Sequence, residues 1–279
     1  MDKEAESLPP GTVIKRHRLS TRVWHWVNFV TLIVMFMSGL MIFNAHPRLY
    51  WGQYGANPDP AWLEIGQRNG EGYLRIGEAS VNTTGVLGVW TNDQGQRQAW
   101  AFPGWITIPS GYSLAEGRRW HLAFAWILGF GLLFYMLWSL ANRHIARDLH
   151  IRKREWRPSH IWRDIRAHAK LRFDTGEPGT YNILQKFSYI GVIFIALPLM
   201  VLTGLTMSPQ MDAGWGFLLD LFGGRQSARS IHFITCWALV AFFFVHIAMV
   251  VLAGPLNELR SIITGRYRLP DRGETEERA

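Results

Sequence analysis

Four of the ten histidines lie inside or at the edge of long apolar stretches: His25, His121, His232 and His246. Imidazole binds transition metals, and it is rare in membrane segments unless it has a function there. His232 and His246 are fourteen residues apart. On an α-helix, fourteen steps of about 100° end about 40° short of four full turns, with a rise of about 21 Å. One helix face therefore carries two imidazoles at two depths, which suits two metal centres.

An arginine stands three residues before three of these histidines, in Arg22-Val-Trp-His25, Arg118-Arg-Trp-His121 and Arg229-Ser-Ile-His232. Residues three apart share one face of a helix. A guanidinium binds a carboxylate through two hydrogen bonds, and it also reaches lipid phosphates from the membrane edge. Each arginine could therefore hold the acidic edge of a cofactor bound by the neighbouring histidine, or anchor its helix at the lipid surface.

The elements that must position these side chains are four windows without any Asp, Glu, Lys or Arg: 25–43, 120–142, 187–211 and 230–257. Each window can cross a hydrocarbon core of about 30 Å, which takes about 20 helical residues. No small-residue cleavage site follows the first window, so we interpret it as a retained span. We predict an all-α membrane protein, a four-helix transmembrane bundle with spans at about 25–43, 120–142, 187–211 and 230–253.

Lys and Arg are unevenly distributed along this bundle. The chain has 29 of them against 21 Asp and Glu, a net charge of +8. Four spans place both termini on one side with the loop 143–186, and that side carries 21 of the 29 while the other side carries 8. The positive-inside rule then places segments 1–24, 143–186 and 258–279 on the cytoplasmic side. We therefore predict a multi-pass protein of a bacterial inner membrane. The basic charge is a topology signal, and no nucleic-acid partner is expected.

This topology sorts the four histidines into two pairs by depth. His25 and His246 lie near the cytoplasmic surface, and His121 and His232 near the external one. Paired imidazoles from facing helices are what a six-coordinate haem needs. The single Cys236 allows neither covalent haem attachment nor iron–sulfur ligation by this chain. For any one histidine an interfacial role is the alternative, but four that match in depth favour two non-covalent, bis-histidine haems.

Residues around the predicted ligands suit a porphyrin. Gly39 is fourteen residues after His25, on the same face and at the depth of the outer haem, where a small residue leaves room for a flat ring. The candidates for binding haem propionates are Arg22, Arg118, Arg119 and Arg229. Pro198 is expected to kink the third span, which carries no histidine.

Segment 44–118 between the first two spans is predicted to form a periplasmic cap. It contains five tryptophans, at positions 51, 62, 90, 100 and 105, and only eleven charged residues. Residues 85–90 and 97–102 flank a polar Thr-Asn-Asp-Gln-Gly-Gln stretch, which predicts a β-hairpin. The tryptophans either fill a small core of the cap or form a docking surface for a partner, with Trp90 and Trp100 as the contacts to test.

Four spans, a histidine that opens each of the first two, and His-x13-His on the fourth resemble the di-haem transmembrane cytochrome b family. That family includes formate dehydrogenase gamma subunits, nickel–iron hydrogenase b-type cytochromes and thiosulfate reductase cytochrome b subunits. The resemblance covers roughly 15–255, and the cap is its least typical part. It implies two haem b groups and an electron-transfer subunit between the membrane quinone pool and a periplasmic redox subunit, a molybdoenzyme or an iron–sulfur protein.

Quinone chemistry needs polar groups beside a haem. Near the inner haem the sequence offers Asn28, Gln185, Lys186 and His144, and family analogy favours that side. Two alternatives remain open: a self-contained cytochrome b561-like quinone oxidoreductase without a fixed partner, and a non-redox membrane scaffold whose histidines are structural. A reduced-minus-oxidised b-type spectrum excludes the scaffold.

Overall fold

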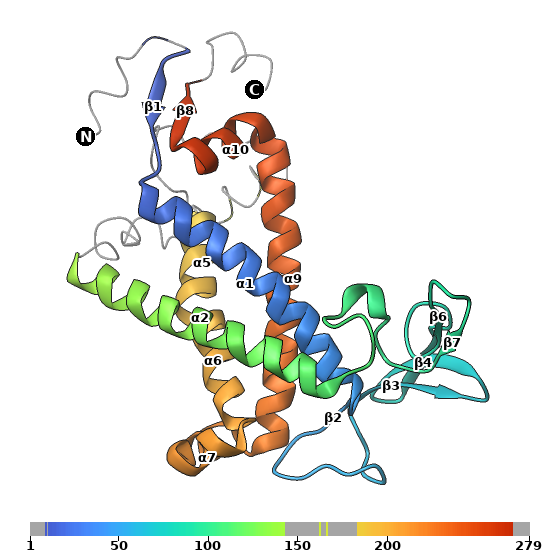
Figure 1. Ribbon diagram of the computed structural model, residues 1–279. Helices are drawn as coiled ribbons and strands as arrows, with labels where there is room; N and C mark the ends of the chain where they lie inside the picture. The colour runs from blue at the N-terminus through green and yellow to red at the C-terminus, as the bar shows by residue number, and fades with distance from the viewer. Residues whose placement is uncertain (1–8, 10, 143–161, 163–165, 167–182, 270–279) are drawn as a thin grey trace. The chain divides into compact units, whose positions relative to one another are not determined.

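The structure is a computed structural model that describes residues 9, 11–142, 162, 166 and 183–269 (Figure 1). Almost all of the predicted cytoplasmic loop falls outside the described residues. This includes His144 and nearly all of the basic segment between the second and third spans. The bundle and the cap can therefore be compared with the sequence predictions, and most of that loop cannot.

Four helices in the described part are long and apolar enough to cross a membrane, as predicted. Their bounds are Leu19–Asn44 for α1, Leu114–Ala141 for α2, Lys186–Thr206 for the third span and Arg225–Ala253 for α9. The chain is thus a mostly helical membrane protein. Two short helices, α7 (Pro209–Trp215) and α8 (Phe217–Phe222), connect the third span to α9.

The helices differ in length from the charge-free windows. α1 and α2 begin six residues before the predicted spans and α9 begins five residues before, because a helix continues beyond the hydrocarbon core and its end turns tolerate charge. The third span ends at Thr206 rather than near 211. Ser208 is extended (φ −91°, ψ 115°) and precedes Pro209, and a residue before proline disfavours the helical conformation.

The third span is not a regular α-helix. It runs through α5 (Ile183–Ile190), the π-helical turn η3 (Gly191–Ala196) and α6 (Leu197–Thr206). Pro198 lacks the N–H that an α-helix would use at that position, and π-turns are a usual way to absorb such a break. The predicted irregularity therefore lies at the turn just before Pro198.

The chain divides into two compact units. Unit 1 comprises residues 1–27, 134–196 and 239–279, and unit 2 comprises 28–133 and 197–238. The helices α1, α2 and α9 each contribute residues to both units, and the third span changes unit between η3 and α6.

Unit 1 pairs the two ends of the chain, which the sequence presented as simple tails. Strand β1 (Val13–Lys15) is antiparallel to β8 (Arg266–Arg268), and α10 (Pro255–Thr264) lies next to β8 in Figure 1. An ion pair of 2.9 Å joins Arg16 to Glu258. Trp24 stacks on Tyr135, with ring centres 6.2 Å apart. The segments 13–16 and 255–268 are therefore bound to each other within unit 1.

Unit 2 contains the cap, which is a small β structure. One sheet has the order β2-β3-β4-β5, all antiparallel, with strands Arg48–Leu49, Leu63–Arg68, Glu71–Ile76 and Ala79–Asn82. A second sheet pairs β6 (Trp90–Thr91) with β7 (Arg97–Gln98), so the predicted hairpin forms but is shorter than the expected arms 85–90 and 97–102. The 3-10 turn η2 (Gly104–Ile106) follows. Leu63 and Ile65 of β3 pack in one core cluster with Leu40 and Phe43 of α1.

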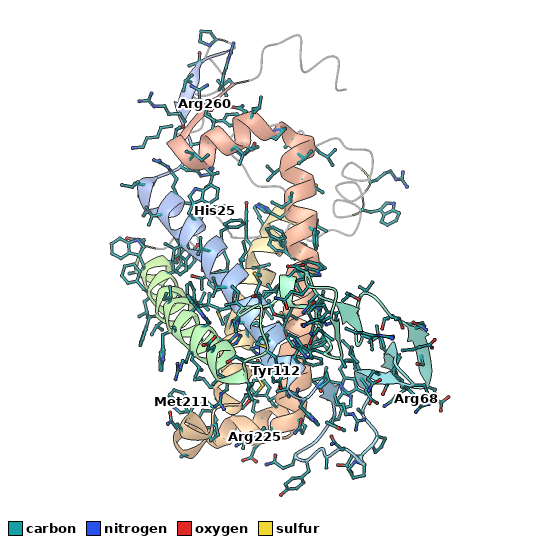
Figure 2. The ribbon with its side chains drawn as sticks, turned by 45° about the vertical axis from the view of Figure 1, so that its right-hand side comes forward. His25, Arg68, Tyr112, Met211, Arg225 and Arg260 are labelled. Atoms are coloured by element: carbon teal, nitrogen blue, oxygen red, sulfur yellow. The ribbon has the colours of Figure 1, made fainter. Side chains whose placement is uncertain are left out.

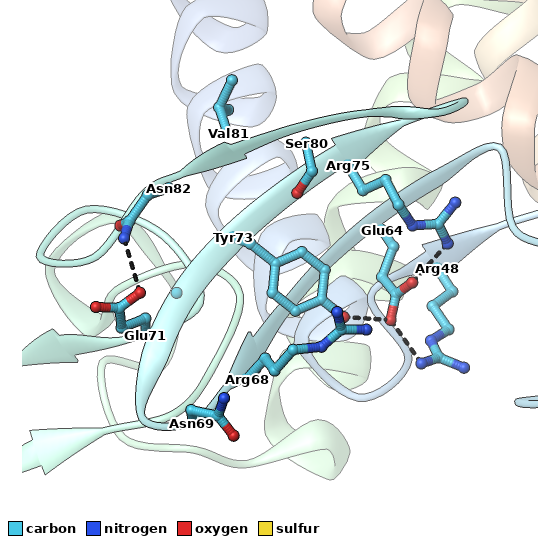
Figure 3. A pocket seen from close by; sticks show the side chains of 11 residues that line it. Arg48, Glu64, Arg68, Asn69, Glu71, Tyr73, Arg75, Ser80, Val81 and Asn82 are labelled. Carbon is cyan, nitrogen blue, oxygen red and sulfur yellow. Dashed lines mark hydrogen bonds and ion pairs between the residues drawn. The ribbon is translucent and has the colours of Figure 1, made fainter.

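The other face of the four-stranded sheet carries a buried carboxylate in a polar pocket of about 480 Å³ (Figure 3). Glu64 is 7% exposed and accepts hydrogen bonds from Arg48 (2.5 Å), Arg75 (2.6 Å) and Tyr73 (2.8 Å). Burial by itself raises the pKa of Glu64, but the hydrogen bonds from Arg75, Tyr73 and Arg48 together outweigh it and lower the pKa. This carboxylate is therefore an ionised structural centre of the cap.

Candidate haem sites

His121 on α2 and His232 on α9 face each other in unit 2. Their ring centres are 6.4 Å apart and the ring planes make an angle of 61°. A ligand nitrogen lies about 2 Å from its metal and about 1.1 Å from its own ring centre, so imidazoles on opposite sides of one iron have centres about 6 Å apart. The observed separation fits a bis-histidine haem.

The donor set around this pair also fits a group that brings its own ligands. Among the described residues, no cluster of three or more His, Cys, Asp or Glu could hold a metal ion by itself. A porphyrin supplies four nitrogens and needs only the two axial ligands from the protein. The two-histidine site is therefore suited to haem rather than to a bare ion.

Each of these rings is held through its Nδ1 atom. His121 Nδ1 lies 3.0 Å from the Met35 carbonyl oxygen and 3.2 Å from Ser38 Oγ. His232 Nδ1 lies 2.9 Å from Thr203 Oγ1. Metal-bound histidines usually use the second ring nitrogen in this way, which fixes the orientation of the ring.

Glycines lie against the same rings. A Cβ atom added to Gly39 would stand 3.3 Å from His121 Cε1, and one added to Gly204 would stand 3.6 Å from His232 Cε1. Gly39 was predicted to leave space at the depth of the outer haem, and the structure places it beside the ring of His121. Its contact with haem itself stays a prediction.

His25 on α1 and His246 on α9 both belong to unit 1 (Figure 2 labels His25). His25 packs edge-on against Trp26, and His246 stacks on Phe242 with ring centres 6.0 Å apart. His25 Nδ1 is buried and has no hydrogen-bond partner among the described residues. The grouping of the four histidines by unit is the same as the predicted grouping by depth, but their role as ligands stays a prediction.

Comparison with known proteins settles the family. The profile described as Prokaryotic cytochrome b561 matches residues 16–265, most of the chain. This chain belongs to the prokaryotic cytochrome b561 family. Membership of a b-type cytochrome family implies haem b, and the spacing of His121 and His232 is compatible with it.

Curated relatives of this cytochrome b561 family member are named as subunits of a reductase and of hydrogenases. A protein-methionine-sulfoxide reductase subunit named YedZ1, from Azospira oryzae, is 31% identical over 83% of this chain and 87% of the relative. A nickel–iron hydrogenase B-type cytochrome subunit from Cupriavidus necator is 24% identical over 88% and 83%, respectively. Its counterpart from Azotobacter vinelandii is 27% identical over 57% and 70%. No solved structure matches the chain.

The four predicted propionate ligands of this cytochrome differ in surroundings. Arg22 donates to the carbonyl of Ile263 in unit 1, and Arg229 donates to the carbonyls of His46 and Arg48 in unit 2. Arg118 and Arg119 are exposed on the first turns of α2. Arg22 and Arg229 thus stabilise nearby backbone. Propionate binding stays a prediction for all four arginines.

The predicted quinone residues are only partly visible. Lys186 is 8% exposed and Asn28 is half-buried, and both interact with other residues. His144 lies outside the described residues, as does the side chain of Gln185. The four predicted quinone residues can therefore not be compared as a set, and the quinone site of the cytochrome stays a prediction.

The cap attaches to the first turns of α9, directly before His232. Trp62 Nε1 donates to Ser230 Oγ at 2.9 Å, and Ser230 Oγ donates to the Tyr50 carbonyl at 2.6 Å. The backbone N–H of Gly52 donates to Ser227 Oγ at 2.7 Å. The cytochrome thus holds its cap on the helix that bears one ligand of the unit 2 pair, a link that no sequence motif indicated.

The cap tryptophans fall into two classes. Trp90 is 6% exposed and meets Trp100 edge to face, with ring centres 5.3 Å apart. Trp51 is 54% exposed and Trp105 is 75% exposed. The choice of Trp90 as a docking contact was therefore wrong, because its ring fills the core of the cap. Trp62 and Trp100 are half-buried, and the indoles of Trp51 and Trp105 are the most accessible to a partner.

Proposed function

We propose that this chain is a di-haem b membrane subunit that transfers electrons between the quinone pool and a redox partner. The observation that carries the proposal is the pair His121 and His232, two imidazoles 6.4 Å apart on facing helices. Haem iron with a histidine on each side has no open position, so it exchanges electrons rather than binding oxygen.

The second haem is proposed for His25 and His246. Both residues are in the same compact unit, and His246 is on the helix that carries His232. An electron cannot cross about 30 Å of hydrocarbon on side chains alone, so a carrier near each surface is needed. When quinol gives its electrons to a haem, it also releases protons. Asn28 and Lys186 are the polar groups that we propose for this proton chemistry.

The orientation of the subunit is proposed from its charge. The side that holds the termini carries 21 of the 29 Lys and Arg residues. Both termini therefore lie on the cytoplasmic side of a bacterial inner membrane, and the cap lies on the periplasmic side. Because the cap is bonded to α9 just before His232, the unit 2 haem is the one next to the periplasm.

The partner is proposed to be a periplasmic redox subunit, a molybdoenzyme or an iron–sulfur protein. The relatives are named as subunits of a methionine-sulfoxide reductase and of nickel–iron hydrogenases, which supports a fixed partner. Exposed Trp51 and Trp105 supply aromatic contacts of the kind enriched in protein interfaces. A quinone oxidoreductase without a fixed partner is the second candidate, and the cytochrome b561 description of the family favours it.

Haem counting tests the proposal. Purified protein should give a reduced-minus-oxidised b-type spectrum, and pyridine haemochrome analysis should find two haems per chain. Protein that is folded and colourless after expression with ample haem supply would refute the electron-transfer function. A single haem per chain would refute the di-haem proposal, and its loss in His232→Ala or in His25→Ala would show which pair holds it.

A further inference from the structure

Two helices of unit 2 present the same short motif to the two histidines. In α1 the sequence is Met35-Phe-Met-Ser-Gly-Leu40, and in α6 it is Met200-Val-Leu-Thr-Gly-Leu205. The hydroxyl residues Ser38 and Thr203 are both 0% exposed. Each is followed by the glycine that touches one ring, so the motif places a buried hydroxyl and a bare backbone against each imidazole.

The hydrogen-bond pattern at His121 determines which ring nitrogen carries the proton. Ser38 Oγ lies 2.6 Å from the Val34 carbonyl, so its only proton is donated there and its oxygen accepts from the ring. The Met35 carbonyl, 3.0 Å from the same Nδ1, can also only accept. Nδ1 of His121 must therefore carry the hydrogen, and Nε2 keeps a free lone pair.

His232 repeats this arrangement on the other helix. Thr203 Oγ1 lies 2.6 Å from the Leu199 carbonyl, four residues back, and donates its proton there. Toward His232 Nδ1, at 2.9 Å, the hydroxyl must then accept. Both rings of the pair are thus fixed with Nδ1 protonated and Nε2 available as a metal ligand.

We propose that Ser38 and Thr203 are positioning residues that orient the two axial ligands of the unit 2 haem and lower its midpoint potential. An acceptor on Nδ1–H makes the imidazole a stronger electron donor, which stabilises ferric over ferrous iron. The inference rests on the proposed function, because it assumes haem at this pair. It adds two residues that sequence reasoning missed and gives them a measurable electronic effect.

The test uses the full-length protein with Thr203→Val, which removes the hydroxyl and keeps the branched shape, and Thr203→Ser, which keeps the hydroxyl. Thr206→Val is the matched control. Thr206 is also buried in α6, and its Oγ1 donates to the Thr203 carbonyl rather than to a histidine. A spectroscopic redox titration resolves the two haem components, and the low-spin ferric EPR signal reports the orientation of the imidazole planes.

Thr203→Val should raise the midpoint potential of one component and move its EPR signal, leaving the other component unchanged. Thr203→Ser and Thr206→Val should titrate as wild type does. Ser38→Ala should shift the same component by less, because its bond to the ring is longer (3.2 against 2.9 Å) and the Met35 carbonyl remains. Ser38→Thr keeps the hydroxyl and should have the wild-type midpoint potential.

Three results would overturn the inference. One is an unchanged potential and EPR signal in both Thr203→Val and Ser38→Ala. Another is equal behaviour of Thr203→Val and Thr203→Ser, including equal loss of haem, because the hydroxyl would then not be the determinant. The third is an equal shift of both components. Loss of the haem in Thr203→Val with full retention in Thr203→Ser supports the positioning role, and absence of haem in wild type refutes the proposed function itself.

Discussion

The two histidine pairs differ in how firmly the surrounding protein holds them. In unit 2 both rings have their Nδ1 atoms bonded, and Ser230, two residues before His232, is bonded to the cap. In unit 1, His25 Nδ1 is buried without a partner among the described residues, and its contacts are aromatic. Ligands fixed by neighbouring hydrogen bonds need little rearrangement to bind a metal group. We therefore expect the unit 2 site to be the more preorganised of the two.

Removing one ligand from each pair has the largest expected effect and tests whether the two sites are separate. His232→Ala should remove the unit 2 haem and His25→Ala the unit 1 haem, so that the content falls from two per chain to one in each case. The reason is that one remaining imidazole cannot hold a six-coordinate haem. The measurement is haemochrome counting on purified, folded protein, with His46→Ala as the control, because His46 stacks on Tyr50 outside the spans.

Loss of both haems from either single change would show that the two sites do not form independently. Retention of two haems in His232→Ala would contradict the assignment of that ligand.

Crowding the ring of His121 tests whether the close packing in unit 2 is needed. Gly39→Val places a branched side chain where even a Cβ would stand 3.3 Å from the ring, and overpacking of this kind costs about 1–3 kcal/mol. We expect a several-fold lower occupancy of the unit 2 haem with normal occupancy in unit 1. The control is Gly129→Ala on α2, where an added Cβ meets nothing within 4 Å.

An unchanged unit 2 haem in Gly39→Val would mean that the ring has room to move and that the site is not tightly preorganised. Equal loss in the Gly129→Ala control would point to general damage to the bundle.

The sequence allowed the four spans and the histidine grouping to be predicted, because both follow from charge and helical periodicity. The helix ends could not be predicted, since arginines such as Arg22 and Arg118 are tolerated in interfacial turns. Ser38 and Thr203 were missed because buried Ser and Thr in membrane helices commonly bond only to their own backbone. The repeated Met-x-x-Ser/Thr-Gly-Leu pattern was the available signal.

The strands of the cap were harder to predict for a different reason. Apart from the β6–β7 hairpin, they mix charged and polar residues with apolar ones, as in Leu63–Arg68, so period-two alternation is weak. The pairing of β1 with β8 joins chain segments more than 250 residues apart, and no local pattern encodes such a contact. Trp90 could be placed in the core only once its neighbours were known, since its residue type suits a core or an interface equally.

Two paired glutamates, one in each unit, extend the comparison to stability. Glu64 in unit 2 is 7% exposed and bonded to two arginines and a tyrosine, whereas the Arg16–Glu258 pair in unit 1 is partly exposed. Glu64→Gln should destabilise the cap by about 1–3 kcal/mol, because it leaves the partly exposed guanidinium groups of Arg48 and Arg75 without a charge partner. Glu258→Gln should cost less than about 1 kcal/mol. Amide hydrogen exchange of β3 and β4, and of β1 and β8, measures the two effects.

The Glu64 contribution also depends on pH. Its folded pKa is lowered, so the stabilisation is fully present above the unfolded value of about 4.3 and is lost as pH falls through the folded pKa. Protection of the β3 and β4 amides, measured relative to their intrinsic exchange rate at each pH, should therefore fall in acid in wild type and show a weaker pH dependence in Glu64→Gln. Identical acid profiles for the two proteins would contradict the structural role of this carboxylate.

The smallest expected effect concerns the two classes of tryptophan within unit 2. Trp105 is 75% exposed and borders an apolar groove of about 380 Å³ with Ile76 and Val86, while Trp90 is 6% exposed. If the exposed indole contacts the redox partner, Trp105→Ala should lower electron exchange with the co-purified partner several-fold, the effect of losing one interface aromatic. Reduction by a small artificial donor and the haem spectrum should be unchanged, because Trp105 has no role in the cap core.

Trp90→Ala serves as the contrasting variant, since truncating a buried tryptophan costs about 3–5 kcal/mol and should disturb the cap and both reactions together. Trp51→Ala, at 54% exposure, tests whether the docking surface extends beyond Trp105. Equal rates with the partner in Trp105→Ala and wild type would assign the exposed indole to the lipid interface, where tryptophan is also enriched. A parallel loss with the artificial donor would assign it to the cap's own stability. Only a loss confined to the partner reaction makes this face of unit 2 the docking surface.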